Sequence, residues 1–238
     1  MMLISIITVT YNCEDEIGKT LESVTKQSFK DYELLLIDGK SSDNTIQVAN
    51  RYKDKIPNMR IYSEPDRGIY DAMNKGALLA NGIYIYYLNA GDTFLDDALL
   101  KNVAKWLEDG KDIYYGSVLK GENIESYPKN IKILLLTLME KMVCHQAIFS
   151  KRSLYTTNLY DLKYQICADR EWLIRMLKKK ASIERMDRLT ICEYDLNGAS
   201  SNYEKFSHES LRIAREYVGV IGVFVVRIKR FIGEIVRH

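Results

Sequence analysis

The sequence has few cysteines and histidines and no long apolar run. Its four cysteines (Cys13, Cys144, Cys167 and Cys192) form no CxxC pair, and only three histidines accompany them. A zinc site and a disulfide framework are therefore disfavoured, and a reducing, cytoplasmic compartment is favoured. No apolar run reaches the roughly 20 residues that span a bilayer, and the start, MMLISIITVTYN, lacks the features of a signal peptide.

An excess of one charge is also missing. The chain has 34 Lys and Arg against 32 Asp and Glu, a formal net charge of +2, which does not indicate a nucleic-acid partner. At 238 residues, 47% hydrophobic and 28% charged, it is a globular chain that can bury a sizeable core. No repeat or low-complexity linker divides it, so we expect one large domain.

Strand-like and helix-like patterns alternate along the first half. Short apolar or β-branched runs predict buried strands at residues 3–10, 32–38, 59–64, 83–89 and 112–117. Amphipathic or capped stretches predict helices at 14–27, 42–52, 68–80 and 96–108. Ser42 is the expected N-cap of the second helix. This alternation predicts an α/β fold with a mainly parallel sheet flanked by helices.

The pattern is looser beyond Gly121. It predicts a helix or buried loop at 129–142, a strand at 144–150, a helix at 168–180 and one or two strands at 181–196. From about residue 211 a tail combines basic residues with the apolar run 217–226. Such a tail fits packing against the domain or against a homodimer partner. It also fits a helix lying on an anionic membrane.

Polar residues follow the carboxyl ends of the first four predicted strands. They are Thr10, Tyr11 and Asn12 after the first, Asp38 after the second, Glu64 and Asp66 after the third, and Asn89 and Asp92 after the fourth. Ligands of open parallel sheets bind outside these strand ends, so we expect one shared site. Its carboxylates suit Mg²⁺ or Mn²⁺, a cation that commonly accompanies a diphosphate.

Two common nucleotide motifs are missing, whereas one unusual helix start is present. No GxGxxG follows the first strand, which disfavours a dinucleotide site. The stretch GKSS at 39–42 resembles the end of a P-loop, but Leu34 occupies the place of the required glycine. The segment EPDRGIYDAMNKG, at 64–76, carries more polar chemistry than a helix cap requires. We therefore expect a ligand in front of that helix.

The segments ISIITVTYN, LLLIDGKSSDNT, EPDRGIYDAMNKG and YLNAGD, in this order and spacing, resemble the family 2 glycosyltransferases that build bacterial surface polysaccharides. HQAIF and ADREWLIRM extend the resemblance to about residue 176. It implies a GT-A fold over residues 1–210, with a nucleotide-sugar half (1–120), an acceptor half (121–210) and a basic amphipathic C-terminal helix (211–238). It also implies inverting transfer from a nucleoside-diphosphate sugar, preferably a UDP-sugar, to a hydroxyl of a glycan or lipid-linked acceptor.

The resemblance assigns roles position by position. Nucleotide contacts fall to Thr10, Tyr11, Asn12 and Asp38, the last toward the base or ribose. The donor pocket would be lined by Asp66, Arg67, Asp71, Asn74, Lys75, Asn89 and Gly91. Asp92 would hold Mn²⁺ or Mg²⁺, and Asp169 would be the catalytic base. His145, Gln146 and Glu171 would lie on the acceptor or diphosphate side, with Glu171 as the alternative base.

The sequence departs from the family pattern at two places. Asn89 and Gly91 stand where an acidic pair usually precedes Asp92, and Ala168 stands where the family often has Glu. One carboxylate would then hold the metal directly, with phosphate oxygens and water completing its shell. The cation, with Lys75 or Arg67, would neutralise the departing diphosphate. Asp169 would accept the proton of the acceptor hydroxyl.

Structural roles and other functions remain open for these residues. Asp38 and Asp92 could simply end strands, Asp169 could cap a helix, and His145 could be a buried, satisfied histidine. Asp71, Asn74 and Lys75 could lie on an exposed helical face. A sugar nucleotidyltransferase or a non-catalytic nucleotide-sugar binder are the alternative functions. The expected location is the cytoplasm, or the inner face of the cell membrane where the tail binds lipid.

Overall fold

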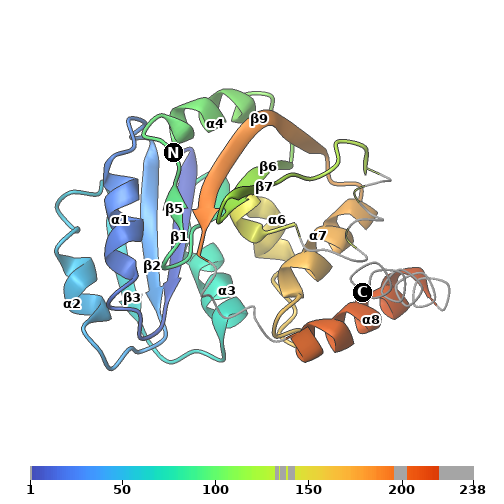
Figure 1. Ribbon diagram of the computed structural model, residues 1–238, viewed down its shortest axis with the longest axis horizontal. Coiled ribbons are helices and arrows are strands. Elements are labelled where there is room, and N and C mark those ends of the chain that lie inside the picture. The colour runs from blue at the N-terminus through green and yellow to red at the C-terminus, as the bar shows by residue number, and fades with distance from the viewer. Residues whose placement is uncertain (1, 132–133, 135–137, 139–142, 196–202, 220–238) are drawn as a thin grey trace.

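The computed structural model describes residues 2–131, 134, 138, 143–195 and 203–219. These residues form one nine-stranded sheet in the order β3-β2-β1-β4-β8-β6-β9-β5, with β7 paired to β6. Figure 1 shows the sheet between its helices, with α8 beside α7 at the end of the molecule away from α2. The predicted α/β architecture is therefore confirmed.

The first four strands make the parallel half of the sheet. They are β1 (Ile4–Thr10), β2 (Tyr32–Asp38), β3 (Met59–Ser63) and β4 (Tyr84–Tyr87). The helices between them are α1 (Ile17–Thr25), α2 (Thr45–Asn50) and α3 (Ile69–Leu79). Every residue of β1, β2 and β4 is buried, as expected for strands covered on both faces.

The helix α3 lies unusually close to β1. A Cβ atom built on Gly76, in the middle of α3, would lie 2.5 Å from Cγ2 of Ile7 and 3.2 Å from Cγ1 of Ile37. Only a residue without a side chain allows this approach. The close packing brings the start of α3 to the carboxyl ends of β1 and β2, where ligands of such sheets bind.

The second half of the sheet is mixed. Its strands are β5 (Thr93–Phe94), β6 (Ile113–Lys120), β7 (Asn123–Glu125), β8 (Ile148–Lys151) and β9 (Ile183–Tyr194). β8 runs antiparallel to both β4 and β6, and β5 runs antiparallel to β9. Among the described strand pairs of this half, only β6 and β9 run parallel. The predicted parallel pairing is therefore found in the first half, where β1 to β4 alternate with helices.

Further helices belong to the second half of the chain. They are α4 (Leu99–Leu107), the 3₁₀ turn η1 (His145–Ala147), α6 (Arg152–Thr157), α7 (Ala168–Lys178) and α8 (Tyr203–Val218). Most of α7 is buried, from Ala168 to Ile174 without a break. Trp172 of α7 stacks on Tyr155 with ring centroids 4.3 Å apart. This packing holds α7 in a fixed orientation, and with it the carboxylates that α7 carries.

Several expected boundaries differ from the observed ones. The expected strand at 144–150 begins at Ile148, because the residues before it form η1. The helix expected from Ser42 begins at Thr45, where the Asp43 carboxylate accepts the Thr45 N–H at 3.0 Å. The helix or loop expected at 129–142 lies largely outside the described residues.

The C-terminal tail is described only in part. The expected boundary at residue 211 falls inside α8, and residues 220–238 lie outside the described part of the chain. Ile213 and Ala214 of α8 are buried against the domain. Within the described ranges, no helix is both long enough and apolar enough to cross a membrane.

Candidate active site

A cavity of about 670 Å³ opens at the carboxyl ends of the parallel strands. Its wall includes five of the residues singled out from the sequence, namely Thr10, Tyr11, Asn12, Asp66 and Asn89. Gly39, Gly68, Ile69 and Asp195 also line it. The expected site at the strand ends therefore exists as a cavity, and α3 forms one side of it.

The loop after β1 presents an aromatic ring to this cavity. Tyr11 is 67% exposed, and Asn12 has a left-handed φ of 47°. The Asn12 N–H donates to Ser41 Oγ at 2.8 Å, and its side-chain oxygen accepts the Ser42 N–H at 2.8 Å. These bonds fix the loop, and the Tyr11 side chain stays exposed at the cavity.

Asp38 holds the neighbouring strand ends together by hydrogen bonds. Its side chain is fully buried, and its carboxylate accepts hydrogen bonds from Thr10 Oγ1 (3.1 Å), Ser63 Oγ (2.6 Å), and the N–H and hydroxyl of Ser41 (2.9 and 2.5 Å). Asp38 therefore ties three strand ends together. Its carboxylate is engaged by protein groups, and it does not itself line the cavity.

Cys13 also lines the cavity, and its side chain is partly buried. Burial raises the pKa of its thiol to about 11, despite a hydrogen bond from Thr45 that lowers it. The reactive thiolate is therefore scarce at neutral pH.

The segment before α3 has the cavity on one side. Asp66 lines the cavity, accepts the Gly68 N–H at 2.8 Å and lies against Gly39, where a Cβ would be 2.6 Å from its Oδ2. Lys75 donates to the Pro65 carbonyl at 2.7 Å and pairs with Glu64 at 2.9 Å. Lys75 thus holds the turn that presents Asp66.

Three other residues of this segment make contacts within the protein. Arg67 is exposed and pairs with Asp71 at 3.1 Å. Burial alone would raise the pKa of Asp71, but the hydrogen bonds from Arg67 outweigh it and hold that pKa below its usual value. Asn74 is buried and bonds through both amide atoms to the Tyr160 backbone, at 2.8 and 3.0 Å. Asn74 therefore fastens α3 to the second half, away from the cavity.

Asp169 occupies the first turn of α7 and is 2% exposed. Its Oδ1 accepts the Tyr70 hydroxyl at 3.1 Å and the Arg170 N–H at 2.8 Å. Burial raises the pKa of Tyr70 far above its usual value, so its hydroxyl stays protonated and donates. Oδ2 contacts Nδ1 of His145 at 3.1 Å.

His145 connects Asp169 to the cavity wall. Its Nε2 lies 2.8 Å from Nδ2 of Asn89, and Asn89 lines the cavity. A neutral imidazole with its proton on Nδ1 fits both contacts, because it donates to Asp169 and accepts from the Asn89 amide. The Oδ1 of Asn89 is buried and has no hydrogen-bond partner among the described residues. A ligand in the cavity could supply one.

Asp92 does not itself line the cavity, but it contacts Asp195, which does. It is 2% exposed, and its carboxylate accepts Nε2 of Gln146 and the backbone N–H of Asp195, each at 2.9 Å. Burial raises the pKa of Asp92 above its usual value, and these two hydrogen bonds offset only part of the rise. The carboxylate that reaches the cavity here is Asp195, whose Oδ2 pairs with Lys19 at 2.7 Å.

Gly91 makes this arrangement feasible. Its φ is 97°, and a Cβ at this position would lie 2.7 Å from Oδ2 of Asp195. Both the backbone conformation and the close approach require glycine. Its N–H donates to Thr20 Oγ1 at 2.9 Å, so Gly91 acts through its backbone and not as a ligand contact.

The side chains around Asp92 are of the type that binds a hard cation, but there are few of them. Asp92, Asp195 and Asn89 offer only oxygen donors, which Mg²⁺ and Mn²⁺ prefer. The unpartnered Oδ1 of Asn89 fits such a cation. Within the described residues, no group of three or more His, Cys, Asp or Glu side chains could hold a metal. A cation would therefore share its shell with oxygens of the ligand.

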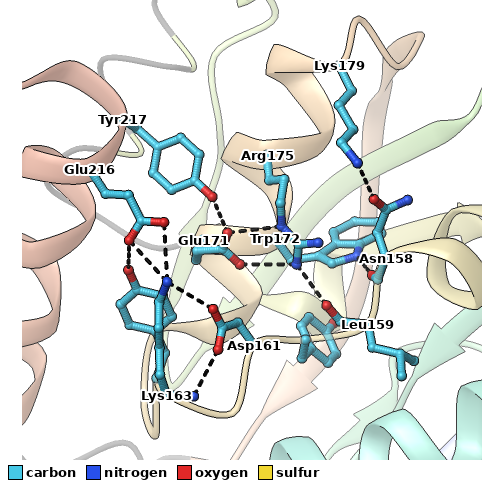
Figure 2. Close-up of polar contacts among 12 residues, drawn as sticks. Asn158, Leu159, Asp161, Lys163, Glu171, Trp172, Arg175, Lys179, Glu216 and Tyr217 are labelled. Atoms are coloured by element: carbon cyan, nitrogen blue, oxygen red, sulfur yellow. Dashed lines mark hydrogen bonds and ion pairs between the residues drawn. The ribbon is translucent and has the colours of Figure 1, made fainter.

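Glu171 faces away from Asp169. Its carboxylate accepts Nε and Nη2 of Arg175 at 3.0 and 3.2 Å, and the hydroxyl of Tyr217. Figure 2 shows Glu171 between Arg175 and Tyr217, on the side of α7 that faces α8. Residues two apart lie on roughly opposite faces of a helix, so the alternative base belongs to the α7–α8 contact.

Two residues near the cavity were not predicted from the sequence. Asp195 follows the end of β9, so the strand-end pattern that identified Asp38 and Asp92 could have identified it. Tyr70 reads in the sequence as an apolar position on α3. Its contact with Asp169 spans 99 residues, and no local signal predicts it.

Comparisons with known proteins agree with this geometry. The family model described as "Glycosyl transferase family 2" matches residues 5–184. A "PGL/p-HBAD biosynthesis glycosyltransferase" of Mycobacterium bovis is 32% identical over 204 residues, which cover 84% of this chain and 79% of that relative.

Solved structures share the fold. S. aureus TarS 1–349 in complex with UDP-GlcNAc has a TM-score of 0.73 at 18% identity, covering 94% of this chain and 70% of that one. The mannosyltransferase PcManGT from Pyrobaculum calidifontis, in complex with GDP-Man and Mn²⁺, has a TM-score of 0.70 at 16% identity, covering 90% and 64%. The chain spans 39% of a longer TarS structure.

The expected GT-A fold is confirmed by these likenesses. The family match covers most of the chain and includes β1 through α7, which carry the cavity and Asp169. The chain belongs to glycosyl transferase family 2 and is a glycosyltransferase.

Proposed function

We propose that the protein transfers a sugar, with inversion, from a UDP-sugar to a hydroxyl group of a glycan or lipid-linked acceptor. The observation that carries this proposal is the contact chain Asp169–His145–Asn89, which joins a buried carboxylate to the cavity wall. A volume of about 670 Å³ lies in the usual range of ligand pockets, roughly 300–1,000 Å³. TarS, which shares the fold, is solved with UDP and with UDP-GlcNAc.

The nucleotide is proposed to lie at the β1 side of the cavity. The exposed ring of Tyr11 offers a stacking surface for the base, and Asn12 and Gly39 line the cavity next to it. Thr10 and Asp38 act mainly by holding this loop. The diphosphate would then point toward Asn89 and Asp195.

The proposed cofactor is Mn²⁺ or Mg²⁺, held by Asp92 and Asp195 on the side where Gln146 orients Asp92. When bound, it would neutralise the charge that accumulates on the departing diphosphate. Lys19, paired with Asp195, adds a positive charge at the same place. PcManGT, with the same fold, is solved with GDP-Man and Mn²⁺.

Asp169 is the proposed base. Its Oδ1 receives two hydrogen bonds from the protein, whereas Oδ2 receives one, from His145. A carboxylate oxygen has two acceptor sites, so Oδ2 keeps one for the acceptor hydroxyl. Direct attack of that hydroxyl on the anomeric carbon inverts the centre. No covalent intermediate with the enzyme is needed.

Membership of family 2 and the GT-A fold decide against the sugar nucleotidyltransferase considered from the sequence. A binder without catalysis makes a different prediction in a donor assay. Incubation with UDP-, GDP- and TDP-sugars and Mn²⁺ should release the nucleoside diphosphate from one UDP-sugar. Binding of a donor without transfer or hydrolysis would favour the binder.

Substitution Asp169→Asn tests the assignment of the base. We expect the transfer rate to fall by roughly 10²–10⁴-fold, the usual contribution of general base catalysis, because an amide cannot accept the proton. Binding of UDP, measured by calorimetry, should stay nearly unchanged, because Asp169 does not line the cavity.

The matched control is Asp97→Asn, which removes an exposed carboxylate just before α4. It should leave both the transfer rate and UDP binding as they are. A fully active Asp169→Asn enzyme would show that another group accepts the proton.

A further inference from the structure

A carboxylate on α8 grips the backbone just before Asp169. Glu209 accepts hydrogen bonds from three consecutive N–H groups, those of Gln165 (2.7 Å), Ile166 (3.0 Å) and Cys167 (2.8 Å). Cys167 is the N-cap residue of α7, and its own side chain forms no capping hydrogen bond. Glu209 therefore satisfies, from another helix, the N–H of the N-cap residue and those of the two residues before it.

The peptide group between Ile166 and Cys167 is held from two sides. Its N–H, that of Cys167, donates to Glu209 of α8 at 2.8 Å, and its carbonyl, that of Ile166, accepts the hydroxyl of Tyr70 at 2.7 Å. The same Tyr70 oxygen lies 3.1 Å from Oδ1 of Asp169. Tyr70 follows Ile69 on α3, and Ile69 lines the cavity. One peptide group thus links α8, the cavity wall and the proposed base.

A second contact joins α8 to the other neighbour of Asp169. The guanidinium of Arg170 lies 5.2 Å from the ring centroid of Phe206, one turn before Glu209 on α8. Arg170 and Asp169 are both almost fully buried. The backbone before Asp169 and the Arg170 side chain after it are therefore both in contact with α8, which follows the site in the sequence.

Electrostatics makes the Glu209 contact strong. Of the three N–H groups, that of Cys167 belongs to the start of α7, where the helix dipole favours an anion. Hydrogen bonds to an ionised acceptor are roughly twice as strong as neutral ones. Without Glu209, three N–H groups before α7 would need other partners, and the turn that orients Asp169 would loosen.

We propose that Glu209 is a positioning residue for the base: it holds residues 165–167 so that Asp169 meets both Tyr70 and His145. The proposal rests on the proposed role of Asp169. Glu209 contacts neither donor nor acceptor and acts through the backbone. A misplacement of about 1 Å can cost roughly 10²-fold in rate, so a small movement of this turn is sufficient to impair transfer.

The test compares Glu209→Ala, Glu209→Gln and the control His208→Ala. His208 is the exposed neighbour of Glu209 on the same helix. In Glu209→Ala we expect kcat for the UDP-sugar to fall at least roughly tenfold. Its KM and the Kd of UDP should stay within about twofold, because the cavity is lined by other segments. Glu209→Gln keeps one acceptor oxygen and should recover part of the rate.

A merely structural role for Glu209 would give another pattern. A loss of UDP affinity that parallels the loss of kcat, with the enzyme still folded in a thermal melt, would overturn the proposal. So would an unchanged kcat in Glu209→Ala. His208→Ala should match the parent in every measurement.

Hydrogen–deuterium exchange separates this proposal from the proposed function. The amides of 165–167 should exchange faster in Glu209→Ala than in the parent or in His208→Ala. If the amides exchange faster in Glu209→Ala but the parent protein transfers no sugar from any donor, the proposed function is refuted. The contact of Glu209 with residues 165–167 is then still supported. Unchanged exchange would refute the grip, whatever the activity.

Discussion

The buried aspartates near the cavity differ in what their carboxylates contact. Asp38 is saturated by hydroxyl and amide donors of the neighbouring loops. Asp92 has two N–H donors, and Asp169 has a histidine and a tyrosine. A saturated carboxylate organises structure, whereas one with a remaining acceptor site can take part in chemistry.

The sequence located these aspartates but not their surroundings. Each stands at a strand end or helix start, which local patterns identify. Their partners lie far along the chain, as in the 99 residues between Tyr70 and Asp169 or the 103 between Asp92 and Asp195. Such contacts depend on the packing of the whole domain, which no local pattern encodes.

Asp92→Asn should make the folded protein more stable at neutral pH. Burial raises the pKa of Asp92 above its usual value of 3.8, so ionisation costs folding stability. This cost is missing at low pH, where Asp92 is protonated, and appears as the pH rises through the folded-state pKa. An asparagine removes it, and Gln146, whose Oε1 has no partner in the described part of the chain, can turn to accept the new amide.

Thermal unfolding at pH 7 and near pH 4 measures this effect. The melting temperature of Asp92→Asn should exceed that of the parent at pH 7, and the difference should shrink at the lower pH. The exposed Asp97→Asn should show no such dependence. A lower melting temperature for Asp92→Asn at pH 7 would mean that the charge is favourable in the folded state.

At the scale of elements, α3 forms one side of the cavity and α7 carries Asp169. Their existence and approximate limits were predicted by periodicity, at 68–80 and 168–180, and are confirmed. Periodicity could not tell which carboxylate of α7 contacts His145, because Asp169 and Glu171 are both buried. The short strand β5 was missed because it has only two residues and its partner β9 lies far along the chain.

Alanine substitutions at two helical glycines should have opposite effects. Gly76→Ala places a Cβ 2.5 Å from Ile7, and such overpacking costs about 1–3 kcal/mol of unfolding free energy. Gly18 of α1 has its nearest neighbours at 3.8 and 3.9 Å, so Gly18→Ala should stabilise by roughly 0.5–1 kcal/mol.

Denaturant unfolding of both variants checks these signs. Gly76→Ala should also raise the KM of the donor, because α3 contributes Ile69 and Ala72 to the cavity wall. Equal effects of the two substitutions would show that α3 does not press on β1 as described.

At the scale of the whole molecule, the site extends past the region that the family shares. The family model ends at residue 184, whereas Asp195 lines the cavity and α8 contacts α7. The first half followed from strand–helix alternation. The second half did not, because antiparallel pairs join strands such as β4 and β8 across more than 60 residues. The division at residues 120 and 210 stays a prediction.

Removal of residues 220–238 tests the proposed membrane contact. This cut spares α8, whereas a cut at 211 would remove the buried Ile213 and Ala214. We expect the full chain to sediment with anionic phosphatidylglycerol vesicles and the shortened chain to stay in the supernatant, because the segment joins basic and apolar residues.

Neutral phosphatidylcholine vesicles and a size measurement complete this experiment. Binding to anionic vesicles alone would support an electrostatic contact at the inner face of the membrane. If the full chain does not bind vesicles and is dimeric, and the shortened chain is monomeric, the tail contacts a second copy of the chain instead.

The grip of Glu209 on residues 165–167 has a consequence for biosynthesis. The ribosome makes α8 after every other described element, at roughly 5–20 residues per second. The residues that line the cavity all precede α8 in the sequence, whereas the backbone before Asp169 receives its Glu209 partner only when residue 209 has emerged. We therefore expect a nascent chain to bind a donor seconds before it becomes able to transfer the sugar.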